Sequence, residues 1–227
     1  SLTSGLYGSR GRIENEVRVH LQLPRFLLQR EQSVLQFELL LFLRRLPLVG
    51  LRGPYRGLDW YGDFVGIVVH PGAVLARRES VDDAGVVHQW QEELSGEAME
   101  QGPVTLSWAD VADAGQTAAD GYNVVIHEFA HVLDMRDGQP DGVPLLQTHK
   151  ARENWLAVLM PEYDRFCERV VCGYETVLDA YAAQAPDEFF AVASEAFFVT
   201  ARALKEEQPA LYRLLASYYR QDPAAQT

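Results

Sequence analysis

Apolar residues recur every three to four positions along most of the second half of the chain, which is the spacing of an amphipathic helix. The spacing predicts helices over four segments: Tyr122–Met135, Thr148–Cys167, Asp187–Ala203 and Pro209–Tyr219. A loop rich in Gly and Pro, Asp137–Pro144, separates the first two. This half of the chain is therefore predicted to be almost entirely helical.

Three shorter segments alternate apolar and polar residues or are rich in β-branched ones, which is typical of strands. They are Phe64–His70, Gly85–Gln91 and Pro103–Trp108. We expect them to form one small sheet. Together with the helices, this sheet predicts a helix-dominated α+β fold.

The first part of the chain has a different pattern. Ser1–Arg12 is rich in Gly, Ser and Arg, whereas Ile13–Leu48 is mostly apolar and predicts two helices. Gly50–Gly57 is a loop by its Gly and Pro content and marks the only internal boundary that composition suggests. We therefore predict a helical N-terminal region over residues 1–56 and a core over residues 57–227. A length of 227 residues suits a single compact domain.

Charge is unevenly distributed along the chain. The sequence has 20 Lys and Arg residues against 32 Asp and Glu residues, a net charge of −12. Residues 1–56 hold nine Arg and four Glu, so residues 57–227 carry 11 basic and 28 acidic side chains, a net −17. Because such a surface repels phosphate backbones, we predict no direct binding to nucleic acid.

The sequence also predicts the cellular compartment. Its most apolar segment, Val34–Leu43, contains polar residues and is shorter than the ~20 residues that a membrane span needs. Cys167 and Cys172 are five residues apart, a spacing that indicates reduced structural thiols and not a redox or zinc pair. We therefore expect a cytoplasmic protein with neither a signal peptide nor a membrane span.

A short motif in the first predicted helix points to a metal site. His127 and His131 are four residues apart, so in a helix their imidazoles lie on one face and can reach one ion. Glu128 then projects beside the open coordination position. Random placement of the His and Glu residues would produce only about 0.01 such motifs in this chain. The motif therefore predicts a zinc hydrolase.

A catalytic zinc ion needs a third protein ligand, with water as the fourth. Three carboxylates compete for that position. Asp137 lies six residues after His131, but the turn before it has Asp134 where glycine would tolerate a positive φ. Glu188 and Glu195 share one face of a Phe-rich helix, where an acid is costly unless it is paired or bound to metal.

Several motifs follow one another in a characteristic order: Gly102–Trp108, His127–Asp134, Gly142–Pro144, Asp179–Ala183, Glu188–Val192 and Ser194–Glu195. In this order they resemble the Mlc titration factor A family of zinc peptidases and, more distantly, the catalytic domain of anthrax lethal factor. The resemblance covers about Gly57–Pro223.

The resemblance implies a zincin-like metallopeptidase fold with one zinc ion per chain. It implies that the ligands are His127, His131 and Glu188. It also implies that Tyr181, seven residues before Glu188, supports the reaction. The activity it suggests is that of an aminopeptidase, and the partner it suggests is Mlc, a glucose-responsive transcriptional repressor, which would link the protein to sugar uptake.

Two acids near the motif, Glu195 and Asp134, and four other histidines lie outside this ligand set. We predict that Glu195 holds a zinc-bound imidazole, with Asp134 competing for the same role because it follows His131 by one turn. The remaining histidines are expected to be structural or exposed: His20, His70, His88 and His149.

These residues together predict zinc-dependent hydrolysis of peptide bonds. Glu128 takes a proton from the activated water and gives it to the leaving amine, while Tyr181 stabilises the oxyanion. The strand Val104–Trp108, if it lies at the sheet edge, aligns the peptide by strand addition. The alternative is a non-catalytic protein that sequesters an Mlc-like repressor and has a structural zinc site.

Overall fold

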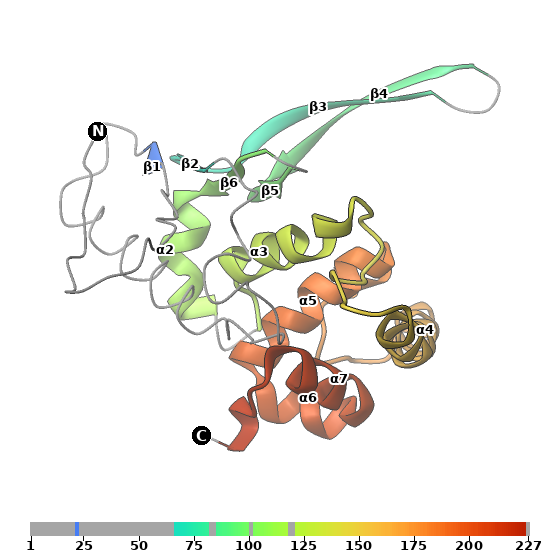
Figure 1. Ribbon diagram of the computed structural model, residues 1–227. Coiled ribbons are helices and arrows are strands. Elements are labelled where there is room, and N and C mark those ends of the chain that lie inside the picture. Colours follow the sequence, from blue (N-terminus) through green and yellow to red (C-terminus); the bar gives the residue numbers. More distant parts are fainter. Residues whose placement is uncertain (1–20, 23–65, 82–84, 100–101, 118–120, 226–227) are drawn as a thin grey trace, which may run out of the picture.

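Figure 1 shows the computed structural model of the chain, which describes residues 21–22, 66–81, 85–99, 102–117 and 121–225. The described part is a helix-dominated α+β fold with a small sheet, as the sequence predicts. In Figure 1 the sheet lies at the top, α3 and α5 lie below it, and α6 and α7 lie at the bottom.

Four of the described strands form the small sheet, in the order β1-β2-β6-β5. Their bounds are β1 Leu21–Gln22, β2 Ile67–His70, β5 Gly96–Ala98 and β6 Val104–Ser107. The first three strands in this order are parallel, and β5 pairs antiparallel with β6. Alternate residues of the central strands point into the core, so that Ile67, Val69, Val104 and Leu106 are buried.

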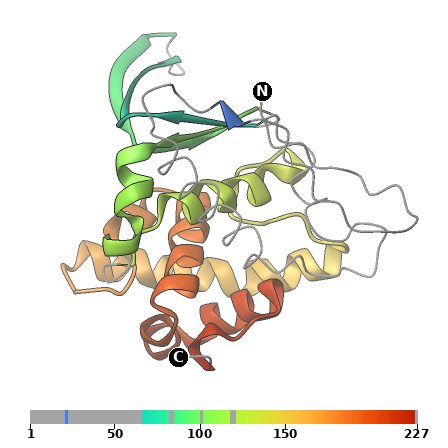
Figure 2. The ribbon, with the colours of Figure 1, turned by 90° about the vertical axis from the view of Figure 1, so that its left-hand side faces the viewer.

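A separate two-stranded hairpin projects from the body in both ribbon views (Figures 1 and 2). It consists of β3, Val74–Val81, and β4, Val87–Leu94. The prediction of one sheet from all three segments was therefore wrong, because the segment Gly85–Gln91 belongs to this hairpin. Val86 and Val87 are exposed there, so these two apolar residues do not face a core.

Six of the described helices are α2 Trp108–Thr117, α3 Val124–Asp134, α4 His149–Val171, α5 Pro186–Val199, α6 Ala201–Glu207 and α7 Pro209–Tyr219. Short 3-10 turns are η3 Met135–Asp137, η4 Ala180–Ala183 and η5 Pro223–Ala225. The helix predicted over Asp187–Ala203 is two helices, because Thr200 leaves the helical conformation (φ −120°, ψ 43°). Helix α2 was not predicted from the sequence.

The predicted N-terminal helices fall almost entirely outside the described residues. Within Ile13–Leu48 only Leu21 and Gln22 are described, and they pair with Ile67 and Val68 as a strand instead of forming a helix. The loop Gly50–Gly57 also lies outside the described residues, so the boundary at residue 57 stays a prediction.

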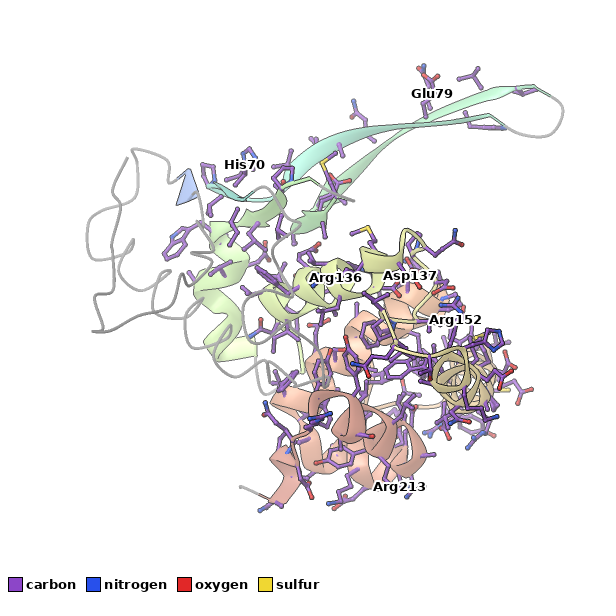
Figure 3. All side chains as sticks on the ribbon, viewed as in Figure 1. His70, Glu79, Arg136, Asp137, Arg152 and Arg213 are labelled. Carbon is purple, nitrogen blue, oxygen red and sulfur yellow. The ribbon has the colours of Figure 1, made fainter. Side chains whose placement is uncertain are left out.

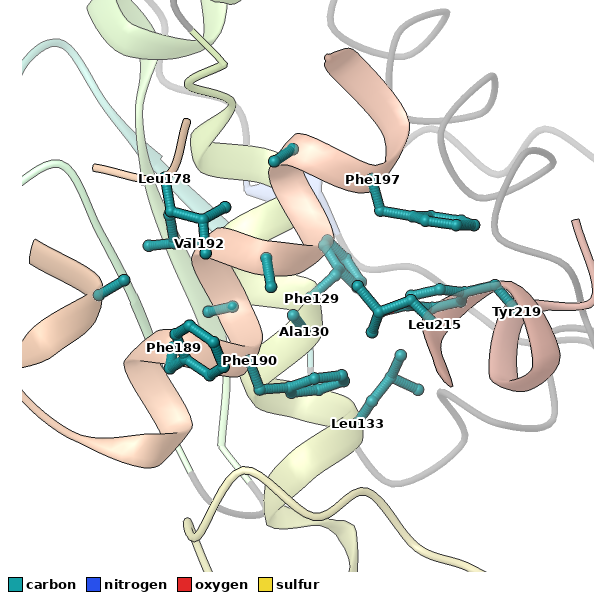
Figure 4. Close-up of a cluster of buried hydrophobic side chains, with 14 of the residues drawn as sticks. Phe129, Ala130, Leu133, Leu178, Phe189, Phe190, Val192, Phe197, Leu215 and Tyr219 are labelled. Atoms are coloured by element: carbon teal, nitrogen blue, oxygen red, sulfur yellow. The ribbon is translucent and has the colours of Figure 1, made fainter. Parts of the chain in front are cut away.

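The hydrophobic core lies between α3, α5 and α7 (Figure 4). Phe129 of α3, Phe189 and Phe190 of α5 and Leu215 of α7 are completely buried. Each such side chain stabilises the fold by about 1.5–3 kcal/mol relative to an exposed one. This packing fixes α3 and α5, which carry the predicted metal ligands, against each other.

Among the described helices, none combines the length and the apolar character that crossing a membrane requires.

Candidate metal centre

Helix α3 presents the two motif histidines on one face. The helix begins after Asn123, whose side chain accepts a hydrogen bond of 3.1 Å from the N–H of Ile126 and so caps the helix. One turn separates His127 from His131, and their Nε2 atoms lie 3.1 Å apart. Both imidazoles therefore point at the same small volume.

Glu188 reaches the two imidazoles from the first turn of α5. Pro186 occupies the first turn as well, where its missing N–H costs nothing. Glu188 Oε2 lies 3.1 Å from His127 Nε2 and 3.4 Å from His131 Nε2. The three potential ligand atoms all lie within 4.8 Å of one another, which makes this group suitable for a metal ion.

Glu195 binds the other nitrogen of His127. Its Oε1 lies 2.8 Å from His127 Nδ1, and its Oε2 accepts a hydrogen bond from the N–H of Asn123. Because a carboxylate at Nδ1 favours the proton on that nitrogen, the lone pair of Nε2 faces His131 and Glu188. Three Lewis-basic atoms then converge, and such a donor set fits a cation.

The charges around the cluster also favour a cation. Burial opposes protonation of His127, but its hydrogen bonds with Glu188 and Glu195 outweigh that effect and raise its pKa to about 10. Burial alone would raise the pKa of Glu188, yet its hydrogen bonds with the two imidazoles lower it. A proton on the His127 imidazole can meet this demand for positive charge, and a bound metal ion would displace that proton from Nε2.

The alternative third ligand, Asp137, lies elsewhere. Its Oδ2 forms an ion pair of 3.2 Å with Arg152, and Figure 3 shows the two side chains together beyond the end of α3. Arg152 also pairs with Asp141. Asp137 is therefore not placed to join the two imidazoles.

Asp134 ties the end of α3 to the loop that follows it. It is completely buried, and its Oδ2 accepts a hydrogen bond of 3.0 Å from the N–H of Gly142. Gly142 has a positive φ of 77°, its carbonyl accepts from Trp155, and a β-carbon at this position would collide with the carbonyl of Pro186. Asp134 therefore positions the loop at Gly142 next to Pro186, and its expected role as an imidazole partner stays a prediction.

Tyr181 lies at the open side of the cluster. It belongs to η4, where its N–H donates to Asp179 Oδ1 at 2.8 Å. Its hydroxyl donates to Glu188 Oε1 at 3.3 Å, and its ring centre lies 6.1 Å from that of His127. Because Tyr181 is 40% exposed, a molecule from solvent can reach its hydroxyl.

Glu128 projects between α3 and the strand β5. It is only 5% exposed, and burial raises its pKa to about 7 although the two imidazoles and a hydrogen bond from the backbone of Ala98 act in the opposite direction. A carboxylate with a pKa near neutrality is suited to accept and return a proton.

The edge strand beside the site is β5 and not the predicted strand Val104–Trp108. Strand β6 lies between β2 and β5, so both its edges are paired. The interpretation of β6 as a substrate-aligning edge was therefore wrong. A three-residue strand with the sequence Gly-Glu-Ala carries too little periodicity to be recognised from the sequence.

The remaining described histidines and the two cysteines do not join the cluster. His70 ends β2, His88 lies exposed in β4, and the exposed His149 forms an ion pair with Glu153. His20 lies outside the described residues. Both cysteines, Cys167 and Cys172, are free.

Comparisons with known proteins agree with this site. The sequence profile of a family described as glucose-regulated metallo-peptidase M90 matches residues 42–220. The chain is 38% identical over 172 residues to proteins named Mlc titration factor A from Yersinia enterocolitica, Yersinia pestis and Yersinia pseudotuberculosis. The match covers 74% of this chain but only 63% of the length of each of these relatives.

Proposed function

Because the chain belongs to the M90 family of glucose-regulated metallopeptidases, we propose that it is a zinc-dependent peptidase with aminopeptidase activity. The observation that carries this proposal is the convergence of His127, His131 and Glu188 with Glu128 buried beside them. A set of two imidazoles and one carboxylate is the ligand set of many catalytic zinc sites.

Zinc held by His127, His131 and Glu188 would supply a Lewis acid that polarises the scissile carbonyl and acidifies a water molecule. Glu128 accepts the proton of that water and later passes it to the leaving amine. The hydroxyl of Tyr181 donates to the oxygen on which negative charge develops. Glu195 keeps the His127 ring in the orientation in which Nε2 faces His131 and Glu188.

The free edge of β5 offers a place to align the peptide. The N–H of Ser107 donates to the carbonyl of Ser95, and hydrogen-bonded pairs alternate along an antiparallel ladder. The backbone groups of Gly96 and Ala98 therefore point to the edge of β5 that pairs with no described strand, where the N–H of Ala98 is hydrogen-bonded to Glu128, whereas Glu97 pairs with β6. A peptide that adds as a strand at this edge would pass next to Glu128.

Measuring metal content and hydrolysis on one preparation tests this function. We expect about one zinc ion per chain, and we expect hydrolysis of a peptide library to be lost on chelation and restored by zinc. An aminopeptidase would cleave peptides with a free amino terminus and spare the same peptides after acetylation. A zinc-loaded protein that cleaves none of them would contradict the proposed activity.

The second proposed role is binding of an Mlc-like repressor, and the identity to proteins named Mlc titration factor A favours it. Among the described residues the metal group has three donors and no fourth, which favours an enzyme over a structural zinc site but does not conflict with a partner. The two roles are compatible because the surface that binds a repressor need not be the metal centre.

We expect the protein to bind the repressor itself and not its operator DNA, because residues 57–227 carry a net −17. Binding should weaken between 0.01 M and 0.15 M salt, as the Debye length shortens from ~30 Å to ~8 Å. Pull-down and mobility-shift assays with the Mlc homologue of the source organism measure both effects. Retardation of operator DNA by this protein alone, or no binding to the repressor at any salt, would contradict this role.

A further inference from the structure

Gly96 lies in β5 directly against the side chain of Glu128. A β-carbon placed on Gly96 would be 2.5 Å from Oε1, 2.6 Å from Cγ and 2.7 Å from Cδ of Glu128. Non-bonded heavy atoms pack at about 3.5–4.0 Å. The strand can therefore come this close to the carboxylate only because residue 96 has no side chain.

The backbone conformation does not explain the glycine. The described glycines with positive φ are Gly85, Gly121, Gly138, Gly142 and Gly173, and Gly96 is not among them. Glycine within a strand or helix is unfavourable by roughly 0.5–1 kcal/mol relative to alanine. A glycine in a regular strand conformation is expected where another group must approach the backbone closely, and here that group is Glu128.

Glu128 has little freedom to move away from β5. Its side chain is 5% exposed, and the backbone of Ala98 forms a hydrogen bond with its carboxylate. A methyl group at position 96 would therefore push either the Glu128 carboxylate away from the Ala98 backbone or β5 away from α3.

We propose that Gly96 is a positioning residue that seats the Glu128 carboxylate against the free edge of β5. The expected effect of Gly96 on turnover rests on the proposed peptidase function. The steric contact between Gly96 and Glu128 does not depend on that function. The three nearest atoms to the added β-carbon all belong to Glu128, so a substitution should displace this carboxylate and leave the metal ligands in place.

A double-mutant cycle on stability tests the contact without any reference to activity. The variants are Gly96→Ala, Glu128→Ala and the combination, with Gly72→Ala as the matched control because its β-carbon would meet no atom within 4 Å. We expect Gly96→Ala to lower the Tm in the presence of Glu128 and to leave it unchanged or raise it in the Glu128→Ala background. Gly72→Ala should have the same small effect in both backgrounds.

Zinc content and kinetics then test the positioning role. Gly96→Ala should keep about one zinc ion per chain, but its kcat should fall by roughly 10- to 100-fold with a smaller change in KM, because a misplacement of ~1 Å can cost ~10²-fold. Gly72→Ala should retain the kinetics of the unaltered protein. A purely structural defect would instead lower zinc content and the active fraction together.

Each outcome decides the question. If Gly96→Ala lowers the Tm equally in both backgrounds, or if the double variant fails to fold while Glu128→Ala folds, Gly96 does not seat Glu128. Unchanged kcat in Gly96→Ala would also overturn the proposal. If the unaltered zinc-loaded protein cleaves no peptide, the peptidase function fails, but the stability cycle still shows whether the contact exists.

Discussion

The variant Glu128→Gln is expected to keep its zinc and its fold and to lose peptide hydrolysis by roughly 10²–10⁴-fold. Gln has the same length as Glu and can still accept a hydrogen bond from the Ala98 backbone, so the local packing is preserved. It cannot take a proton from water, and this is the step that we propose for the buried Glu128. Zinc content by metal analysis and kcat/KM on a cleaved peptide measure the two properties separately.

Tyr181→Phe provides the comparison for this loss. In the proposed mechanism the Tyr181 hydroxyl shares the stabilisation of the oxyanion with the metal, so we expect its removal to cause a smaller fall in kcat than Glu128→Gln. Both variants should bind zinc like the unaltered chain, because neither residue belongs to the group His127, His131 and Glu188. Equal turnover in Glu128→Gln and the unaltered protein would contradict the mechanism.

The second large effect concerns the metal itself. His131→Ala and Glu188→Ala are each expected to lower zinc from about one ion per chain to a small fraction of that value, because two protein ligands rarely retain zinc. In the unaltered protein, zinc at 100 times its Kd should stabilise the fold by about 2.7 kcal/mol. In a chain of this size that corresponds to a rise in Tm of roughly 5–10 °C, which the two variants should not show.

Two carboxylate variants serve as controls for this loss. Asp137→Ala should retain stoichiometric zinc, since Asp137 pairs with Arg152 and not with the imidazoles. Glu195→Gln should bind zinc about 10–100-fold more weakly and not lose it altogether, because Glu195 orients His127 without belonging to the metal group. Retention of zinc by Glu188→Ala together with its loss from Asp137→Ala would show that the ligand assignment is wrong.

Local periodicity predicted the helices well because burial against one core fixes which face of each helix is apolar. The motif His127–His131 lies in a single helix, so its geometry follows from the spacing of 3.6 residues per turn. The carboxylate of Glu188 comes from a helix 57 residues further on, and the sequence pattern alone left three acids in competition. Family resemblance favoured Glu188, and the position of α5 brings Glu188 to the imidazoles.

The features that sequence reasoning missed depend on contacts between distant segments. Strand β5 is only three residues long, and its importance comes from its position between β6 and α3. The hydrogen bond between the Asp134 carboxylate and the N–H of Gly142 was not predicted either, because it joins the end of α3 to a loop eight residues further on. A helical spacing shows which residues share a face, and it does not show which group of another segment will meet that face.

Both ends of α3 are joined to α5 by protein groups alone, and this changes the thermodynamics of metal uptake. Glu195 accepts from Asn123 at the start of α3, and Asp134 holds Gly142 against Pro186 at its end. The donor atoms are therefore preorganised, so the ion loses its hydration shell without having to order a polypeptide as well. We therefore expect metal exchange to be a local equilibrium, in which the occupancy of the site follows the concentration of the free ion rather than the folding of the chain.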